Sequence, residues 1–215
     1  MTIPRVLLAD DHSILLEAFR KLLDGKCEVV GAVSDGRALL KEAQRLQPDA
    51  IVIDVGMPLL NGLEAGRQLR QLLPGAKLIF LTMNEDPDVA LEAMRSGASA
   101  YLLKTSAASE LFVAIRDALK GKSYVTPRIA GRMDDALARH PHGRSGERTL
   151  TTRQIEVLQL LAEGKSMKEA ADHLEVTPRT IAFHKYRMME ELGVKSSAEL
   201  IQFAVKSRIV APREF

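Results

Sequence analysis

Short apolar runs alternate with helical patterns through the first 121 residues of the chain. The runs cover residues 6–9, 29–30, 51–53, 78–81 and 100–103, and each is followed by apolar residues at helical spacing. An apolar run without alternation predicts a strand that is buried on both faces of a parallel sheet. Five β-then-α units in this order predict a doubly wound (βα)5 α/β domain over residues 1–121, with helices on both faces of the sheet.

The pattern changes at residue 122. Residues 122–149 are poor in aliphatic side chains and combine several arginines with glycine and proline. This composition predicts a flexible basic linker, with a short helix near residues 133–139.

Residues 150–215 carry only helical patterns. Thr151 with Gln154 and Ser166 with Glu169 have the spacing of capping boxes, and Thr177 before Pro178 is a further helix start. A tight connection joins the second predicted helix to the third. We therefore predict a separate all-α domain of four helices that contains a helix-turn-helix.

Composition narrows the class of protein. The chain has 215 residues, 46% of them hydrophobic, which is enough for two packed domains without disulfides. The single cysteine, Cys27, lies in a strand-like run, and we expect a small core residue in a reducing compartment. The N-terminus does not resemble a signal peptide, and no apolar run approaches the ~20 residues of a membrane span. We expect a cytoplasmic protein that has no membrane partner.

The charge is unevenly divided between the two halves. Residues 1–121 contain 14 Lys and Arg against 16 Asp and Glu, a net charge of −2, whereas residues 122–215 contain 16 against 12, a net charge of +4. A basic rear half favours an anionic partner such as nucleic acid there.

Polar side chains end four of the five predicted strands: Asp10 with Asp11, Asp54, Thr82 and Lys104. The carboxyl ends of parallel strands share one edge of the sheet, so these residues are expected to converge. Three neighbouring carboxylates need a cation, and hard oxygen ligands favour Mg²⁺. The set predicts phosphoryl transfer to Asp54, which would give an acyl phosphate. Taken singly, each residue also has an ordinary structural role, such as a helix cap for Asp11 or Asp54.

Residues 1–121 resemble the receiver domain of a two-component response regulator, which has a flavodoxin-like fold. The resemblance rests on Leu8-Ala9-Asp10-Asp11-His12, on Asp54-Val55-Gly56-Met57-Pro58-Leu59-Leu60-Asn61-Gly62, on Leu81-Thr82-Met83, and on Gly97-Ala98-Ser99-Ala100-Tyr101-Leu102-Leu103-Lys104.

The resemblance implies a role for each matching residue. Asp54 would accept a phosphoryl group from a phosphohistidine of a sensor histidine kinase, and Lys104 would pair with that group. Thr82 and Tyr101 would form the switch. Mg²⁺ would be bound directly by Asp11, Asp54 and the carbonyl of Gly56, and through water by Asp10.

One residue departs from the receiver pattern. Many receivers have a proline joined by a cis bond after the lysine, and here Thr105 follows. A non-proline cis bond costs about 3 kcal/mol, so either that cost is met or the local backbone differs.

The third helix of the rear domain has two distinct faces at ~100° per residue. Ile181, Met188 and Leu192 fall on one side, with His184 at its margin, and Arg179, Phe183, Tyr186 and Glu190 fall opposite. The outer face is suited to a DNA major groove, with a phosphate at the helix start near Thr177. Exposed aromatic side chains also suit a protein interface. The basic residues expected to reach the DNA backbone are Lys165, Arg179, Lys185 and Arg187.

Residues 150–206 resemble the LuxR-type helix-turn-helix of NarL/FixJ-class regulators. The match rests on Leu150-Thr151-Thr152-Arg153-Gln154, Gly164-Lys165-Ser166, Ala170-Ala171-Asp172-His173-Leu174, Thr180-Ile181 with His184, and Glu191-Leu192-Gly193-Val194. The resemblance implies a homodimer that pairs through its last helix on an inverted repeat of promoter DNA. Thr180, Ala182, Phe183 and Tyr186 would face the DNA. Gln154 stands where the family usually has Glu, which removes a charge that often holds a basic residue near the recognition helix.

These features together predict a transcription factor controlled by phosphorylation. Phosphorylation of Asp54 would bias the switch and thereby release or dimerise the DNA-binding domain. One alternative is an atypical regulator that binds DNA without phosphorylation, against which the complete acidic set argues. Another is an aspartyl phosphatase, but such enzymes usually have a second Asp two residues after the nucleophile, where this chain has Gly56. We expect no enzyme activity beyond slow self-dephosphorylation.

Overall fold

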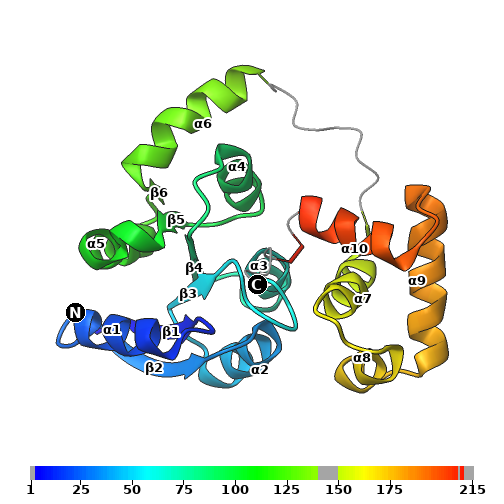
Figure 1. Cartoon of the computed structure of the whole chain (residues 1–215). Helices are drawn as coiled ribbons and strands as arrows, with labels where there is room; N and C mark the ends of the chain where they lie inside the picture. The colour runs from blue at the N-terminus through cyan, green and yellow to red at the C-terminus, as the bar shows by residue number, and fades with distance from the viewer. Residues whose placement is uncertain (1–2, 140–149, 208, 211–215) are drawn as a thin grey trace. The chain divides into compact units, whose positions relative to one another are not determined.

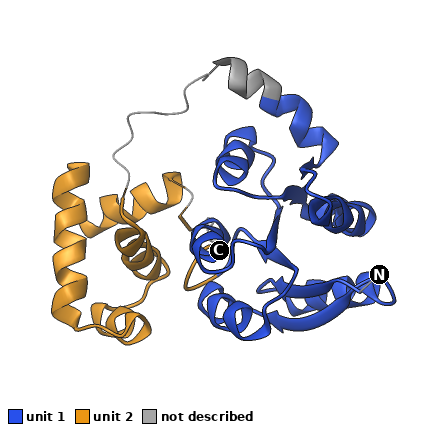
Figure 2. Cartoon of the chain, turned by 180° about the vertical axis from the view of Figure 1, so that it is seen from behind, with its two compact units in different colours: residues 1–57, 62–144 blue, residues 58–61, 145–215 orange. Residues whose placement is uncertain are grey.

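The structure is a computed structural model that describes residues 3–139, 150–207 and 209–210. Contacts divide the chain into two compact units (Figure 2). The first unit comprises Met1–Met57 and Gly62–Arg144, and the second comprises Pro58–Asn61 and Ser145–Phe215. In the part of the chain described here, no helix is long and apolar enough to cross a membrane.

The first unit is built on one six-stranded parallel sheet in the order β2-β1-β3-β4-β5-β6. This confirms the predicted doubly wound fold, with one strand more than expected. The elements are β1 (Arg5–Ala9), α1 (Ser13–Leu23), β2 (Glu28–Val33), α2 (Gly36–Leu46), β3 (Ala50–Asp54), α3 (Gly62–Leu72), β4 (Lys77–Thr82), α4 (Pro87–Arg95), β5 (Ala100–Leu103), the 3-10 turn η1 (Lys104–Ser106), α5 (Ala107–Leu119), β6 (Tyr124–Val125) and α6 (Pro127–Arg139).

Helices cover both faces of this sheet. Figure 1 shows α1 and α5 on one face and α2, α3 and α4 on the other. Alternate residues of the central strands face α1 and α5, where they pack with Phe19, Leu23 and Leu111. All five residues of β3 are buried, as its unalternated sequence predicted. The apolar runs at 6–9, 51–53, 78–81 and 100–103 are buried as predicted, whereas the run at 29–30 lies in the outer strand β2 and is only half-buried.

Glycine lets α3 lie close to the end of β3 and to the face of β4. A Cβ atom on Gly62 would stand 2.1 Å from the backbone oxygen of Asp54, and one on Gly66 would stand 2.4 Å from the ring of Phe80. Neither position has room for a side chain. The start of α3 is thereby held against the strand end that carries Asp54.

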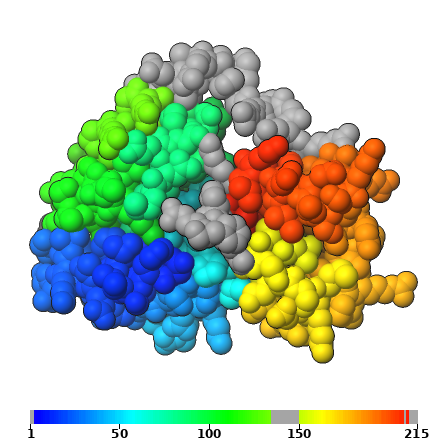
Figure 3. Space-filling view, in the orientation of Figure 1, coloured from blue at the N-terminus to red at the C-terminus, as the bar shows by residue number. Residues whose placement is uncertain are grey.

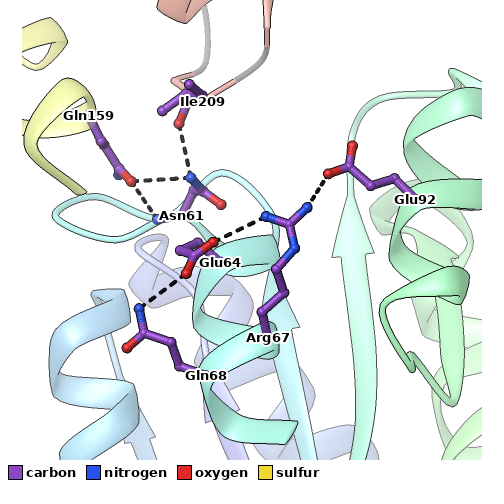
Figure 4. A network of polar contacts seen from close by, with 7 residues as sticks. All are labelled: Asn61, Glu64, Arg67, Gln68, Glu92, Gln159 and Ile209. Carbon is purple, nitrogen blue, oxygen red and sulfur yellow. Dashed lines mark hydrogen bonds and ion pairs between the residues drawn. The ribbon is translucent and has the colours of Figure 1, made fainter. Parts of the chain in front are cut away.

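A charged residue connects α3 with α4 (Figure 4). The carboxylate of Glu64, in the first turn of α3, is only 1% exposed and accepts a hydrogen bond from Arg67 Nη1 at 3.1 Å. Arg67 also pairs with Glu92 of α4. Because a buried carboxylate is costly without partners, Arg67 offsets the burial of Glu64 and joins the two helices.

The sixth strand and α6 lie within residues predicted to be a flexible linker. That prediction did not include β6, and the helix begins at Pro127 rather than near residue 133. Ile129 is fully buried, and Arg128 and Arg132 pair with Glu85 at 3.0 and 3.2 Å. Part of the expected linker is thus packed structure, while residues 140–149 lie outside the described part of the chain.

The second unit contains the four predicted helices: α7 (Thr152–Ala162), α8 (Met167–Leu174), α9 (Pro178–Leu192) and α10 (Ser197–Lys206). Both predicted capping boxes are present, and Thr177 caps α9 by accepting a hydrogen bond from the Thr180 backbone. Ile181 and Met188 are fully buried, as the predicted inner stripe of α9 requires. They pack with Val157, Leu158, Leu160, Ala170, Ala171, Leu174, Leu200 and Ala204 in a core of the unit's own.

Candidate functional site

Strand register brings the predicted acidic and basic residues to one edge of the sheet. Ala9 pairs with Ile53, so the next residues, Asp10 and Asp54, are neighbours. Asp54 pairs with Leu81 and Thr82 with Leu103, which places Thr82 and Lys104 on the two following strand ends. The convergence follows from pairing four parallel strands that end at the same level.

Lys104 forms two ion pairs in the centre of this group. Its Nζ lies 2.8 Å from Asp10 Oδ2 and 3.0 Å from Asp54 Oδ1. All three side chains are at least nine-tenths buried. Burial raises the pKa of Asp54, and Asp10 adds to the effect, whereas Lys104 acts against it. The pocket thus holds more negative charge than one lysine balances.

The acidic group has the chemistry of a Mg²⁺ site. Ligand atoms of Asp10, Asp11, His12 and Asp54 all lie within 4.8 Å of one another. Three carboxylates against one lysine leave an excess of two negative charges when His12 is neutral, which a divalent cation would neutralise. Mg²⁺ prefers oxygen ligands and takes one or two carboxylates with water. The donor set therefore fits the predicted metal, and Gly56 lies on the exposed turn directly after β3.

The prediction did not include His12 in this group. Its Nδ1 lies 3.0 Å from Asp10 Oδ1 and 2.7 Å from Asp11 Oδ1, and its backbone N donates to Asp10 at 2.9 Å. The sequence signal that could have placed His12 in this group was its position directly after Asp10 and Asp11. The side chain is 64% exposed, so it lies at the mouth of the acidic group and not in its buried part.

The two predicted switch residues lie on β4 and β5. Thr82 is 4% exposed, and its hydroxyl accepts a hydrogen bond from the backbone N of Asn84 at 2.9 Å. Tyr101 is fully buried and pairs with Phe80 in the sheet register. The hydroxyl of Thr82 therefore holds the first residues of the loop between β4 and α4.

The backbone after Lys104 takes the second of the two predicted courses. Among the described residues there is no cis peptide bond, and Lys104–Ser106 form the 3-10 turn η1. Thr105 is exposed on this turn. Lys104 reaches both carboxylates from this backbone.

The outer face of α9 is exposed and partly basic. Phe183 is 57% exposed and Tyr186 62%, and both belong to the helix that is coloured orange in Figure 3. The side chains of the other predicted contacts are exposed or half-buried: Lys165, Thr177, Arg179, Thr180, Ala182, Lys185 and Arg187. Lys185 Nζ lies 5.7 Å from the centre of the Tyr186 ring, a cation–π arrangement.

Comparison with known protein families agrees with both units. Residues 6–116 match the response regulator receiver domain, and residues 148–204 match the bacterial regulatory proteins of the LuxR family. The chain therefore belongs to the two-component response regulators that combine a receiver domain with a LuxR-type DNA-binding domain.

Relatives with the same organisation cover nearly the whole chain. The oxygen regulatory protein NreC of Staphylococcus aureus (strain JH9) is 30% identical over an alignment of 214 residues. The alignment covers 96% of this chain and 99% of that protein. RcsB of Salmonella enterica serovar Typhimurium, solved on promoter DNA with a phosphomimetic, is 28% identical, with a TM-score of 0.61 over 95% of this chain and all of that one. A LuxR-family regulator from Aurantimonas is 32% identical over 64% of this chain and 99% of its own, with a TM-score of 0.61.

Proposed function

We propose that a sensor histidine kinase phosphorylates this response regulator on Asp54, and that phosphorylation controls DNA binding by the second unit. The observation that carries the proposal is the pairing of Lys104 with Asp54 beside the Asp10–Asp11 group. A nucleophilic carboxylate, a cation for the transferred group and a divalent metal site are the three requirements of this reaction.

Phosphoryl transfer exchanges one bond for another. An oxygen of Asp54 attacks the phosphorus of a phosphohistidine, the P–N bond breaks, and an acyl phosphate forms. The nitrogen of the leaving imidazole takes up a proton. Asp11, Asp54 and the Gly56 carbonyl would hold Mg²⁺ directly, with Asp10 acting through water, and the metal would neutralise charge on the phosphoryl oxygens. Lys104, already beside Asp54, pairs with the same oxygens.

The switch acts through the loop that follows Thr82. When the Thr82 hydroxyl turns to a phosphoryl oxygen it leaves the Asn84 backbone N, and Tyr101 packs behind it. Glu85, next in that loop, pairs with Arg128 and Arg132 of α6. A change at Thr82 can therefore reach α6, the last helix before the DNA-binding domain in the sequence.

DNA binding uses the outer face of α9 in a major groove. Thr177 and the helix start receive a phosphate, and Lys165, Arg179, Lys185 and Arg187 contact the backbone. Ala182, Phe183 and Tyr186 face the bases, and Thr180 also faces the DNA. Contacts with phosphate set affinity, and contacts with bases set sequence choice. A solved structure of the relative RcsB contains two dimers bound to two parallel DNAs. A homodimer of this chain would pair through α10, where Ile201 and Val205 are exposed, and would read an inverted repeat.

We also propose domain limits and a location. The receiver covers residues 1–121 and is extended by β6 and α6 to residue 139, which confines the linker to residues 140–149, and the DNA-binding domain covers residues 150–215 of a cytoplasmic protein. Gly56 at the position of a phosphatase's second Asp supports slow self-dephosphorylation and no turnover of other substrates.

One experiment separates the phosphorylated regulator from its alternatives. Wild type and Asp54→Ala are incubated with Mg²⁺ and acetyl phosphate, then compared for mass, dimerisation and DNA affinity. We expect one added phosphoryl group, and altered dimerisation or affinity, in wild type alone. An unmodified wild type that binds its promoter equally well would identify an atypical regulator, and continuous phosphate release would identify a phosphatase.

A further inference from the structure

A polar chain joins α7 to the C-terminal half of α9. Gln154 is only 3% exposed, and its Nε2 donates to Glu191 Oε2 at 2.6 Å. Its Oε1 accepts from the Thr151 backbone N at 2.8 Å. The amide of Gln154 is therefore fixed in one orientation, since an exchange of its O and N atoms would oppose donor to donor at Thr151.

The second oxygen of Glu191 continues the chain to the surface. Glu191 Oε1 accepts from Arg187 Nε at 2.8 Å, one helical turn earlier on α9. The Arg187 side chain is 59% exposed. Bonding at Nε leaves the four N–H groups of the two terminal nitrogens for another acceptor.

Gln154 and Glu191 are matched as hydrogen-bond donor and acceptor. A glutamate at position 154, as is usual in the family, would place a second carboxylate oxygen against Glu191 where the distance is now 2.6 Å. Two carboxylates cannot share that contact unless one takes up a proton. In this chain the charge that a glutamate at 154 would supply stands instead on Glu191, which bonds the basic residue directly.

We propose that Glu191, held in place by Gln154, is a positioning residue that orients Arg187 towards a DNA phosphate. This rests on the proposed contact of Arg187 with DNA. An exposed ion pair contributes little when both side chains are mobile. The pair of Arg187 and Glu191 differs from such a mobile pair, because the other oxygen of Glu191 accepts a hydrogen bond from the buried and fixed amide of Gln154. Arg187 is consequently ordered before DNA arrives, which reduces the entropy lost on binding.

The test exchanges Gln154 and Glu191 within the full chain. In Gln154→Glu/Glu191→Gln, the new carboxylate at position 154 accepts from the Thr151 backbone N and from the new amide at position 191. The oxygen of that amide accepts from Arg187, so each of these three contacts again joins a donor to an acceptor, and the net charge is that of wild type. In Gln154→Glu/Glu190→Gln the net charge is also unchanged, but two carboxylates still meet. Glu190 is exposed, and no described residue bonds to its side chain.

DNA affinity is measured on a labelled duplex of arbitrary sequence, because phosphate contacts do not depend on sequence. Salt is varied between about 50 and 200 mM. We expect Arg187→Ala and Gln154→Glu to bind about three- to tenfold more weakly and to lower the salt slope by about one. The DNA affinity of the exchanged variant should return to within about twofold of the wild-type affinity. The charge-matched control should remain as weak as Gln154→Glu.

Glu191→Gln gives a comparison that does not need Gln154→Glu alone to fold. The exchanged variant carries one more negative charge than Glu191→Gln, so charge alone predicts weaker binding to DNA. Positioning predicts tighter binding and a steeper salt slope. The opposite order, or a control that recovers as fully as the exchanged variant, overturns the proposal.

Arg187→Ala distinguishes a failure of the proposed DNA contact from a failure of the positioning role. Wild-type affinity in that variant refutes the contact between Arg187 and DNA, and the positioning role with it. Weaker binding by Arg187→Ala together with unchanged binding by Gln154→Glu refutes the positioning role alone.

Discussion

Lys104 Nζ lies 3.0 Å from Asp54 Oδ1, and both side chains are almost completely buried. Before phosphorylation, the lysine is thus the counter-ion of the carboxylate that we propose as the phosphoryl acceptor. The same amino group lies 2.8 Å from Asp10. Lys104 and the proposed Mg²⁺ would therefore act on the same carboxylates, so we expect their effects on stability to be linked.

Lys104→Met is expected to destabilise the first unit by about 3–5 kcal/mol, because two buried carboxylates lose their partner. Added Mg²⁺ should then raise the thermal midpoint more in the variant than in wild type, since the metal replaces the missing charge. Thermal unfolding with and without Mg²⁺ measures both effects. In an Asp54→Ala background the loss should be smaller, and an equal loss would show that Lys104 acts through other contacts.

Thr126 gives a test of whether β6 and α6 are integral to the first unit. Its buried hydroxyl donates to Glu110 at 2.7 Å and accepts from the Leu103 backbone N at 3.1 Å. Thr126→Val leaves that backbone N–H unpaired, and we expect a loss of about 1–3 kcal/mol in denaturant unfolding. Thr105→Val, at an exposed position, is the matched control. Equal stability of the two variants would mean that the contacts of Thr126 add nothing to the unit.

The polar residues at the strand ends were predictable because each directly follows a short apolar run. The order of runs and helices fixes a parallel sheet, and a parallel sheet brings Asp10, Asp54, Thr82 and Lys104 together. The two residues of β6 were not predictable, because so short a strand has no period of its own. Its pairing depends on Tyr124 N reaching Ser99 O at 3.1 Å, a contact made by the fold.

Contacts between side chains of different helices were also not predictable. The replacement of Glu by Gln154 suggested a lost charge, and only the packing of α7 against α9 shows that Glu191 supplies one. Likewise, helical spacing placed His184 at the margin of the inner face of α9. Its surroundings depend on Arg153, from another helix.

Gly62→Ala tests how closely α3 must approach β3. The added Cβ would stand 2.1 Å from the Asp54 backbone oxygen, so the strand end or the helix must move. We expect a loss of stability of at least about 1–3 kcal/mol, together with slower phosphorylation by acetyl phosphate. Gly131→Ala is the control, because no atom lies within 4 Å of its added Cβ. Within α6 that change should stabilise by about 0.5–1 kcal/mol. A neutral Gly62→Ala would contradict the tight packing at Asp54.

His184 should make the stability of the second unit depend on pH near neutrality. Burial lowers the pKa of its imidazole, and the positive charges of Arg153 and Arg187 lower it further. The unfolded chain, with a pKa of about 6.5, therefore binds a proton at a higher pH than the folded unit. Stability from this group is fully present above about pH 6.5 and is lost as pH falls towards the folded pKa.

His184→Gln removes this titration and keeps a side chain of polar character. Chemical denaturation of both proteins between about pH 5.5 and 7.5 should show wild type gaining stability over the variant as pH rises, since histidine is the side chain that titrates in that window. Taking the difference between the proteins cancels the other histidines. Parallel profiles would show that the folded unit does not disfavour the charged imidazole, and would place His184 outside the influence of Arg153 and Arg187.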